Sequence, residues 1–273
     1  MTPESIVEST VAALEGIRAR RPLVHNITNY VVMNSTATPL LSLGASPVMA
    51  HAAEEVADLA SIAGALVINI GTLSGPWIEA MVLAGRAARA AGVPVVLDPV
   101  GAGATRLRTD VSLRLLREAP PTVIRGNASE ILALGAAGAG GRGVDAAHTV
   151  GQARAAAVDL ARSTGAVVAV TGAEDFVTDG RFDVRVANGH PLMARVTGTG
   201  CAATAVTGAF CAVERDPLAA AVGALVVFGI AGERAAEGSP RPGTYQVRLL
   251  DALDEVDGGA VRARVRVRVA ATA

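Results

Sequence analysis

Residues Thr197-Gly198-Thr199-Gly200-Cys201 join a glycine-rich turn to a cysteine. They link a strand-like run, residues 182–187 and 194–196, to an alanine-rich stretch at 201–213 that predicts a buried helix. A glycine-rich turn at the start of a helix presents several backbone N–H groups to an anion, and the helix dipole adds positive potential there. The turn therefore predicts phosphate binding beside a thiol. A structural alternative stays open, because short G-x-G-C matches are common and Cys201 can simply be a small buried side chain.

Polar residues also follow four predicted strands, at 65–70, 93–97, 122–125 and 166–171. In an open parallel sheet, ligands bind beyond the carboxyl ends of the strands. Ordinary loop chemistry explains any one of these residues, but their recurrence at one edge, together with the turn at residue 198, favours a shared cleft. The polar residues are Gly71-Thr72, Asp98, Arg125 to Glu130, and Thr171-Gly172.

Two carboxylates at this edge, Asp98 and Glu130, are candidate ligands of Mg²⁺. Mg²⁺ keeps several waters and takes few protein oxygens, so these acids would bind it directly or through water. Arg125 is a candidate for a two-point contact with a nucleotide phosphate. Each acid also has a structural interpretation: Asp98 as a cap or turn residue, and Glu130 as a first-turn charge favoured by the helix dipole.

The elements that must position these residues alternate along the chain. A first helix is predicted after the cap pair Thr2-Pro3, and further helices at 77–91, 107–118 and 148–163 separate the four strands. The strands are continuously apolar, as expected of parallel strands covered on both faces. The order predicts a three-layer α/β fold with a mostly parallel central sheet.

No long linker divides the chain, so residues 1–260 are predicted to form one domain. A hairpin is predicted at 175–187, and the glycine-rich segment 135–143 is predicted to be an exposed loop. Residues 261–269 alternate Val with Arg or Ala. This pattern fits either a charged edge strand or a disordered tail, and we expect residues 261–273 to be a tail.

Composition narrows the function classes. The 273 residues are 51% hydrophobic with a net charge of −1, which is typical of a soluble globular protein and gives no excess positive field for nucleic acid or membranes. Every basic residue other than histidine is Arg, which excludes a P-loop lysine and a Schiff-base lysine. The four histidines lack metal-ligand spacing, and the G-x-S-x-G motif of hydrolases is absent. No G-x-G-x-x-G motif follows the first predicted strand, which argues against a dinucleotide-binding dehydrogenase.

The two cysteines, Cys201 and Cys211, lie ten residues apart in one predicted helix, about 15 Å along its axis, which is too far for a disulfide. A reducing, cytoplasmic location is therefore expected. The N-terminal stretch has no apolar signal-peptide core. The apolar run 217–232 is shorter than the roughly 20 residues that span a bilayer, so it predicts a core helix.

Several motifs together resemble known kinases. Asn127-Ala-Ser-Glu130 is similar to the N-x-x-E motif of the ribokinase-like kinases, and Gly198-Thr-Gly-Cys201 sits where that superfamily carries G-x-G-D. Four longer segments, in consistent order between about residues 5 and 257, resemble the hydroxyethylthiazole kinase family of thiamine salvage. These segments are Pro22-Leu-Val-His-Asn-Ile-Thr-Asn29, Asn69-Ile-Gly-Thr-Leu73, Leu97-Asp-Pro-Val-Gly-Ala102 and Val196-Thr-Gly-Thr-Gly-Cys201.

The resemblance implies a ribokinase-like fold and Mg²⁺-dependent transfer of the γ-phosphoryl group of ATP to the primary hydroxyl of 4-methyl-5-(2-hydroxyethyl)thiazole. It also implies a homotrimer with active sites between subunits. By motif, Arg125, Thr171 and Gly200 resemble nucleotide-binding positions, and Asp98 and Glu130 resemble the family's metal-and-phosphate acids. The positions that resemble substrate-binding residues are Met49, Gly198, Asn26, Gly71 and Thr72.

Cys201 takes the place of the superfamily's usual aspartate base. Phosphoryl transfer depends mostly on positioning and charge stabilisation, so the thiol could orient or deprotonate the alcohol. The helix N-terminus should lower its pKa and neighbouring phosphates should raise it, a balance that the sequence leaves open. Three alternatives also stay open: a kinase for another small alcohol, an ADP-forming dehydratase of the same fold, and a non-catalytic nucleotide-binding or assembly protein.

Overall fold

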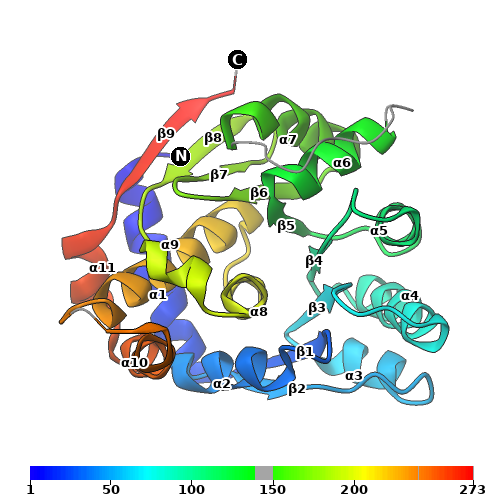
Figure 1. The fold of residues 1–273 in the computed structure, drawn as a ribbon, viewed down its shortest axis with the longest axis horizontal. Helices are drawn as coiled ribbons and strands as arrows, with labels where there is room; N and C mark the ends of the chain where they lie inside the picture. The colour runs from blue at the N-terminus through cyan, green and yellow to red at the C-terminus, as the bar shows by residue number, and fades with distance from the viewer. Residues whose placement is uncertain (139–149, 239, 273) are drawn as a thin grey trace.

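A central sheet organises the chain, which we describe from a computed structural model covering residues 1–138, 150–238 and 240–272 (Figure 1). The nine strands within these residues have the order β2-β1-β3-β4-β5-β6-β7-β8-β9. Neighbours from β2 to β6 are parallel, and the pairs from β6 to β9 are antiparallel. The strands are β1 Leu23–Ile27, β2 Ser46–Val48, β3 Ala65–Asn69, β4 Val95–Asp98, β5 Val123–Asn127, β6 Val167–Thr171, β7 Asp175–Thr178, β8 Phe182–Val186 and β9 Val267–Ala271.

Helices cover both faces of this sheet, which gives the three layers expected from the sequence (Figure 1). One face carries α3 Val56–Ile62, α4 Gly75–Ala90, α5 Arg106–Glu118, α6 Ala128–Gly138 and α7 Val150–Thr164. The other carries α1 Pro3–Arg20, α2 Met33–Leu43, α8 Thr199–Cys211, α9 Pro217–Ala235 and α10 Pro242–Glu255, with the short helices η1 Pro191–Arg195 and α11 Gly258–Arg264 beside them.

Helices α8 and α9 form the centre of the larger core. Small side chains allow α8 to lie close to the sheet: a Cβ on Gly208 would come within 2.6 Å of a Val67 methyl of β3. Helix α9 is long and apolar enough to cross a membrane by length and composition alone, yet 89% of that stretch is buried inside the fold. This burial identifies α9 as the core helix that its sequence predicts.

Most predicted elements are confirmed within a few residues at their ends. The cap pair is confirmed in detail, because the Thr2 side chain accepts a hydrogen bond from the backbone of Ser5 and the Ser5 side chain accepts one from Thr2. The four parallel strands correspond to β3, β4, β5 and β6, and the predicted hairpin corresponds to β7 and β8.

Other predictions differ from the structure. Residues 194–196 do not extend a strand, because Pro191 begins the short helix η1, whose first turn is capped by the His190 side chain. Helix α6 continues to Gly138, into the segment predicted as a loop, and the rest of that segment and the predicted start of the next helix at residue 148 lie outside the described residues. Strands β1 and β2 were not predicted, because polar residues, His25 and Asn26, interrupt the apolar run of β1 and because β2 has only three residues.

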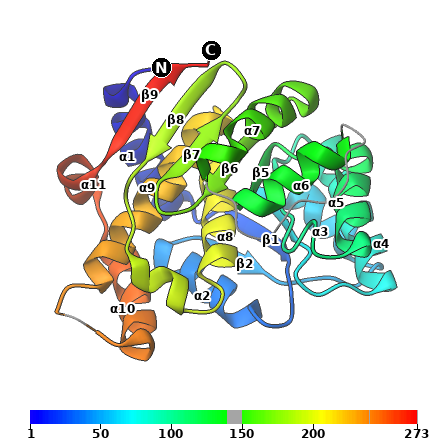
Figure 2. The ribbon, with the colours of Figure 1, turned by 45° about the horizontal axis from the view of Figure 1, so that its top comes forward.

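The predicted C-terminal tail is also wrong for the described residues up to 272. After α11, strand β9 pairs antiparallel with β8, with Val267 opposite Val186 and Ala271 opposite Phe182 (Figure 2). The alternation of Val with Arg or Ala is therefore that of an edge strand. Partial burial of Val267 and Val269 against the main core, while the arginines face solvent, explains why the strand forms.

His25 of β1 is a buried titratable group in this core. Its Nε2 lies 2.9 Å from the carbonyl oxygen of Ala50, and its Nδ1 has no hydrogen-bond partner. Burial lowers the pKa of His25, with the Ala50 hydrogen bond opposing that effect. The neutral ring, with Nε2–H donating to Ala50, therefore fits the site, whereas protonation would leave a second buried N–H unpaired.

We predict that His25 makes the folded state less stable as the pH falls. Because its pKa is lower in the folded than in the unfolded chain, the unfolded chain binds more protons once the pH drops below about 6.5. Urea unfolding at pH 7.5 and 5.5 should show a smaller loss of free energy of unfolding in His25→Gln than in the original chain. The other histidines are common to both proteins, so equal losses would contradict the role of His25.

Candidate active site

The predicted site residues gather at the carboxyl edge of the parallel strands. The register places Asn69 opposite Asp98 and Asn127 opposite Thr171, so the ends of β3, β4, β5 and β6 are aligned. Helix α8 packs on β1, β3 and β4. Its N-terminus reaches the same edge, because Thr204 in its second turn hydrogen-bonds to Asp98. The shared cleft expected from the sequence therefore has a structural basis.

The turn before α8 has a conformation that requires glycine. Gly198 is the N-cap of α8 and has φ +87°, and a Cβ there would lie 2.7 Å from Ser35 Oγ. Gly200, in the first turn, faces Arg125: a Cβ at Gly200 would lie 3.0 Å from one guanidinium nitrogen. The N-terminal N–H groups of α8 and a cationic side chain thus converge on one place, an arrangement suited to binding phosphate.

A cavity of about 580 Å³ adjoins this place and is lined by Arg125, Thr171 and Gly200. Arg125 donates to Thr171 Oγ1 at 2.7 Å, while its buried Nε–H has no partner among the residues that the structure describes. Apolar residues from α9, Leu225 and Phe228, form another part of the wall. The cavity therefore combines an anion-binding end with an apolar end, as a nucleotide would need.

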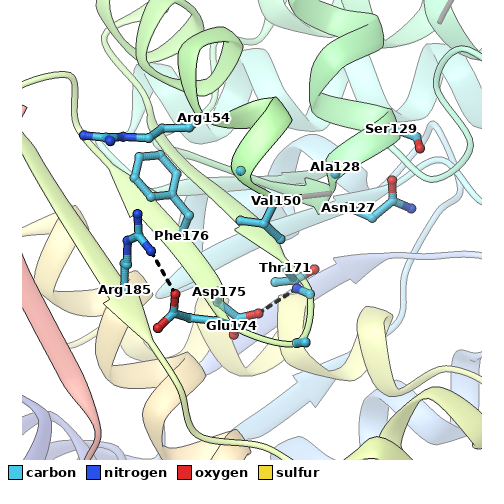
Figure 3. Close-up of a pocket in the computed structure, with 13 residues that line it drawn as sticks. Asn127, Ala128, Ser129, Val150, Arg154, Thr171, Glu174, Asp175, Phe176 and Arg185 are labelled. Carbon is cyan, nitrogen blue, oxygen red and sulfur yellow. Dashed lines mark hydrogen bonds and ion pairs between the residues drawn. The ribbon is translucent and has the colours of Figure 1, made fainter. Parts of the chain in front are cut away.

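A second cavity, of about 560 Å³, shares residues 171–173 and Asp175 with the first. Figure 3 shows Asn127 and Ser129 on one side of it and Glu174 and Arg185, joined by an ion pair, on the other. Asp175 accepts a hydrogen bond from the backbone N–H of Gly172, which fixes the turn between β6 and β7 that separates the two cavities.

Cys201 belongs to a buried chain of polar side chains. Asn29 Nδ2 lies 3.7 Å from Cys201 Sγ and donates to Asn69 Oδ1 at 2.9 Å. Asn69 Nδ2 donates to Asp98 Oδ2 at 2.8 Å, and Thr204 Oγ1 donates to the same oxygen at 2.8 Å. The chain connects the ends of β1, β3 and β4 to α8, so the thiol and the Asp98 carboxylate are held in one fixed relation.

Gly71 and Thr72, which follow β3, are held by neighbouring loops. A Cβ on Gly71 would lie 2.4 Å from Asn29 Nδ2, so a larger residue would displace that amide. Thr72 Oγ1 accepts a hydrogen bond from the backbone N–H of Tyr30. Arg108 of α5 donates to the carbonyl oxygens of Gly71 at 2.7 Å and Val100 at 2.5 Å, and thereby joins the loops after β3 and β4.

The other two predicted substrate-binding residues lie at the β1–β2 end of the edge. Asn26 is buried in β1, where its Nδ2 donates to the Val24 carbonyl oxygen and its Oδ1 has no partner. Val48 of β2 pairs with His25, so Met49 leaves the sheet beside Asn26 and is half-buried.

Backbone N–H groups bond to both carboxylate oxygens of Glu130. Its two carboxylate oxygens accept hydrogen bonds from the N–H groups of Gly101 at 2.8 Å and Asn127 at 2.7 Å, and Asn127 caps the Glu130 N–H in return. This is the reciprocal cap of a helix start. It also ties the loop after β4 to the beginning of α6.

Burial controls the charge of the central groups. It raises the pKa of Asp98 to about 6, with Arg125 acting in the opposite direction and Glu130 adding to the rise. Burial also raises the pKa of the Cys201 thiol to about 11, and the Asp98 charge adds to that effect. The sequence left the direction of this pKa open, and burial decides it, so Cys201 is a neutral thiol at neutral pH.

Four residues that contribute to the site were not predicted from the sequence: Asn29, Asn69, Arg108 and Thr204. Asn29 and Asn69 lie inside the segments that carry the family resemblance, and Asn69 ends a strand, so its position was a usable signal. Thr204 lies one helical turn after Cys201 on α8. Arg108 acts through backbone carbonyls, and no sequence pattern predicts such contacts.

Comparison with known proteins agrees with this geometry. Residues 14–258 match the model of the hydroxyethylthiazole kinase family. The hydroxyethylthiazole kinase of Granulibacter bethesdensis is 55% identical over 261 residues, which cover 96% of this chain and 95% of that protein. The protein of the same name from Oleidesulfovibrio alaskensis is 54% identical and covers 93% of this chain and 96% of its own length.

Solved structures give the same result. The hydroxyethylthiazole kinase protein of Pyrococcus horikoshii OT3 superposes with a TM-score of 0.90 at 49% identity, covering 96% of this chain and 99% of that one. Staphylococcus aureus pyridoxal kinase, with a TM-score of 0.64 and 16% identity over 92% and 98% of the two chains, shares the fold, which is ribokinase-like. By its sequence, its family match and its fold, the chain belongs to the hydroxyethylthiazole kinase family.

Proposed function

We propose that this chain phosphorylates the primary hydroxyl of 4-methyl-5-(2-hydroxyethyl)thiazole with ATP, as a step of thiamine salvage. The main support is the convergence of Cys201, Arg125 and the α8 N-terminus at the edge where the family's motifs meet. This arrangement supports a site for a transferred phosphoryl group next to a side chain able to hold an alcohol.

The nucleotide is placed in the cavity beside Arg125. Its phosphates lie toward Gly200 and the α8 N-terminus, where Arg125 contributes a positive charge and Thr171 holds the guanidinium. The base and ribose extend toward Leu225 and Phe228. The unpaired Nε–H of Arg125 supports this placement, since a buried donor without a partner is costly unless a ligand satisfies it.

The acids fit Mg²⁺ that arrives with the nucleotide. No group of three His, Cys, Asp or Glu side chains forms a ready-made metal site among the residues described. Within the described part of the chain, both hydrogen bonds to the Asp98 carboxylate reach Oδ2, which leaves Oδ1 without one, whereas both oxygens of Glu130 accept backbone N–H groups. We therefore assign Asp98 the nearer position and Glu130 a position through water. The ion would neutralise charge on the phosphates.

Cys201 orients the substrate hydroxyl in this proposal. Its neutral thiol and the Asn29 amide form a polar pair beside the α8 N-terminus. The alcohol oxygen attacks the γ-phosphorus as the bond to the β-phosphate oxygen breaks, and the hydroxyl proton leaves late, on the transferred phosphoryl group or to solvent. The N–H groups of Gly198 to Cys201 stabilise the developing charge.

The thiazole ring is placed between Met49 and Gly198, near Asn26, Gly71 and Thr72. This part of the edge carries exposed apolar side chains, with Tyr30 63% and Val31 69% exposed. We infer that a neighbouring subunit covers them in a homotrimer, so that the site is completed between subunits. Both cysteines are free thiols, which fits a reducing cytoplasmic location.

We predict that release of ADP from Mg-ATP depends on the thiazole alcohol. A coupled assay should show turnover with 4-methyl-5-(2-hydroxyethyl)thiazole that greatly exceeds turnover with hydroxymethylpyrimidine, with pyridoxal, or without an alcohol. A preference for another alcohol would identify a different kinase of the same fold. If none of these alcohols stimulates ADP release, a dehydratase or a binding protein is favoured instead.

We predict that Cys201→Ala lowers kcat by about 10- to 100-fold, because it removes an orienting group rather than a strong base. Cys211→Ala, the same change at the far end of α8, should keep kcat and serves as the control. An unchanged kcat in Cys201→Ala would exclude a catalytic role for the thiol, and a loss well above 10³-fold would indicate that it acts as the base.

The trimer is tested by light scattering after size exclusion. The chain should have three times its monomer mass of 27.4 kDa, and Val31→Asp should lower the mass and the turnover together, because it places a charge in the proposed interface. Leu107→Asp, at an exposed apolar residue of α5 on the other face, is the matched control and should change neither. A fully active monomer would contradict the shared site.

A further inference from the structure

We propose that the C-terminal segment, residues 258–272, positions one wall of the nucleotide cavity, and that Arg266 is its positioning residue. The proposal rests on the placement of ATP beside Arg125. The family match ends at residue 258, and the role is argued from contacts seen in this chain. The wall consists of Asn188 and Gly189, which follow β8 and line the cavity.

Both polar atoms of the Asn188 side chain form hydrogen bonds with the C-terminal segment, and Nδ2 also bonds to Glu233 of α9. Asn188 Nδ2 donates to the Arg264 carbonyl oxygen at 2.8 Å and to Glu233 Oε1 at 3.1 Å. Its Oδ1 accepts from the backbone N–H of Arg266 at 2.9 Å. Asn188 is 6% exposed, so these bonds are shielded from water and hold the side chain in one orientation.

Arg266 adds a second set of contacts to the same wall. Its guanidinium donates to Glu233 Oε1 at 2.5 Å and twice to the carbonyl oxygen of Ala187, and its own carbonyl accepts from the Ala187 N–H. Glu233 Oε1 in turn accepts from the backbone N–H of Gly189 at 2.9 Å. The guanidinium thus holds in place the carboxylate that anchors Gly189, whose φ of +136° requires glycine.

The wall has no room to move toward the core. A Cβ on Gly229 of α9 would lie 2.7 Å from Asn188, so the helix backbone packs directly against this residue. On the other side, β9 runs along β8 and α11 leads into it (Figure 2). The wall is therefore held between a rigid core helix and the last described elements of the chain.

The same segment also contacts a second loop that lines the cavity, the turn between β6 and β7. Arg268 of β9 donates to Glu174 in this turn, and Glu174 also pairs with Arg185 of β8 (Figure 3). The neighbours of Glu174 in sequence, Ala173 and Asp175, line the cavity. The segment 264–268 thus contacts two loops that line the cavity, and neither loop belongs to the proposed thiazole site at Met49 and Asn26.

Loss of the Arg266 side chain should therefore weaken nucleotide binding selectively. A wall with fewer anchors samples more conformations, and binding must then restrict them. We expect Arg266→Ala to raise the KM for ATP and the Kd for Mg-ADP by about 3- to 10-fold, while the KM for the thiazole alcohol stays within about twofold.

The matched control is Arg262→Ala. Arg262 lies in α11, pairs with Glu8 and has a 51% exposed side chain, compared with 53% for Arg266. It has no contact with the wall, so its removal should leave both KM values unchanged. An equal rise in the KM for ATP in both variants, or no rise in Arg266→Ala, would overturn the proposal.

A double-variant cycle separates positioning from general loss of stability. Glu233→Gln acts on the same wall from α9, so its effect on the Kd for Mg-ADP should be less than additive with that of Arg266→Ala. Thermal unfolding measured in parallel shows whether each protein is folded. If Arg266→Ala does not fold, Arg266→Lys replaces it in the experiment. The lysine keeps the charge but lacks the forked guanidinium, so we expect a rise in the Kd for Mg-ADP smaller than that predicted for Arg266→Ala. Strict additivity would count against a shared wall.

A failure of the proposed kinase function and a failure of the proposed role of Arg266 would give different experimental results. Absence of thiazole-dependent turnover in the original chain would contradict the kinase assignment, while calorimetric titration with Mg-ADP still tests the wall. If Arg125→Ala leaves Mg-ADP binding unchanged, the nucleotide lies elsewhere and the inference about Arg266 falls with that placement.

Discussion

The close approach of α8 to the sheet is the constraint on which the site depends. A helix that brings its N-terminal N–H groups to the carboxyl edge of β3 and β4 must lie almost directly on those strands, and the small residues of α8 make this possible. Thr204 then fixes the rotation of the helix through its hydrogen bond to Asp98. Position and rotation together determine where Cys201 lies relative to Arg125.

The same packing explains the unusual electrostatics of the edge. Asp98 is buried beneath α8, where desolvation disfavours its charge, and Arg125, Asn69 and Thr204 offset that penalty. Cys201 shares this environment and keeps its proton. The fold thus brings hydrogen-bond donors and the Arg125 guanidinium together at a buried place. This suits a reaction in which charge shifts among phosphate oxygens more than one driven by a strong base.

The sequence predicted the parallel strands β3 to β6 and the edge at which the site lies, because both depend on local signals: continuous apolar runs and the polar residues that follow them. It failed where long-range contacts decide the outcome. Strand β9 forms because β8, about 80 residues earlier in the sequence, offers a partner. Asn188 bonds to Arg264 and Arg266 across a similar separation in sequence. The direction of the Cys201 pKa also depended on burial, which the helix N-terminus alone did not reveal.

Strand β9 has one more consequence, for solubility. Without it, β8 would be the outer strand, and its row of unpaired N–H and C=O groups would be open to pairing with another chain. Strand β9 covers that row and carries the exposed Arg268, with Arg266 just before it. Charged side chains on an edge strand disfavour strand-to-strand association, so β9 protects the sheet from aggregation as well as extending it.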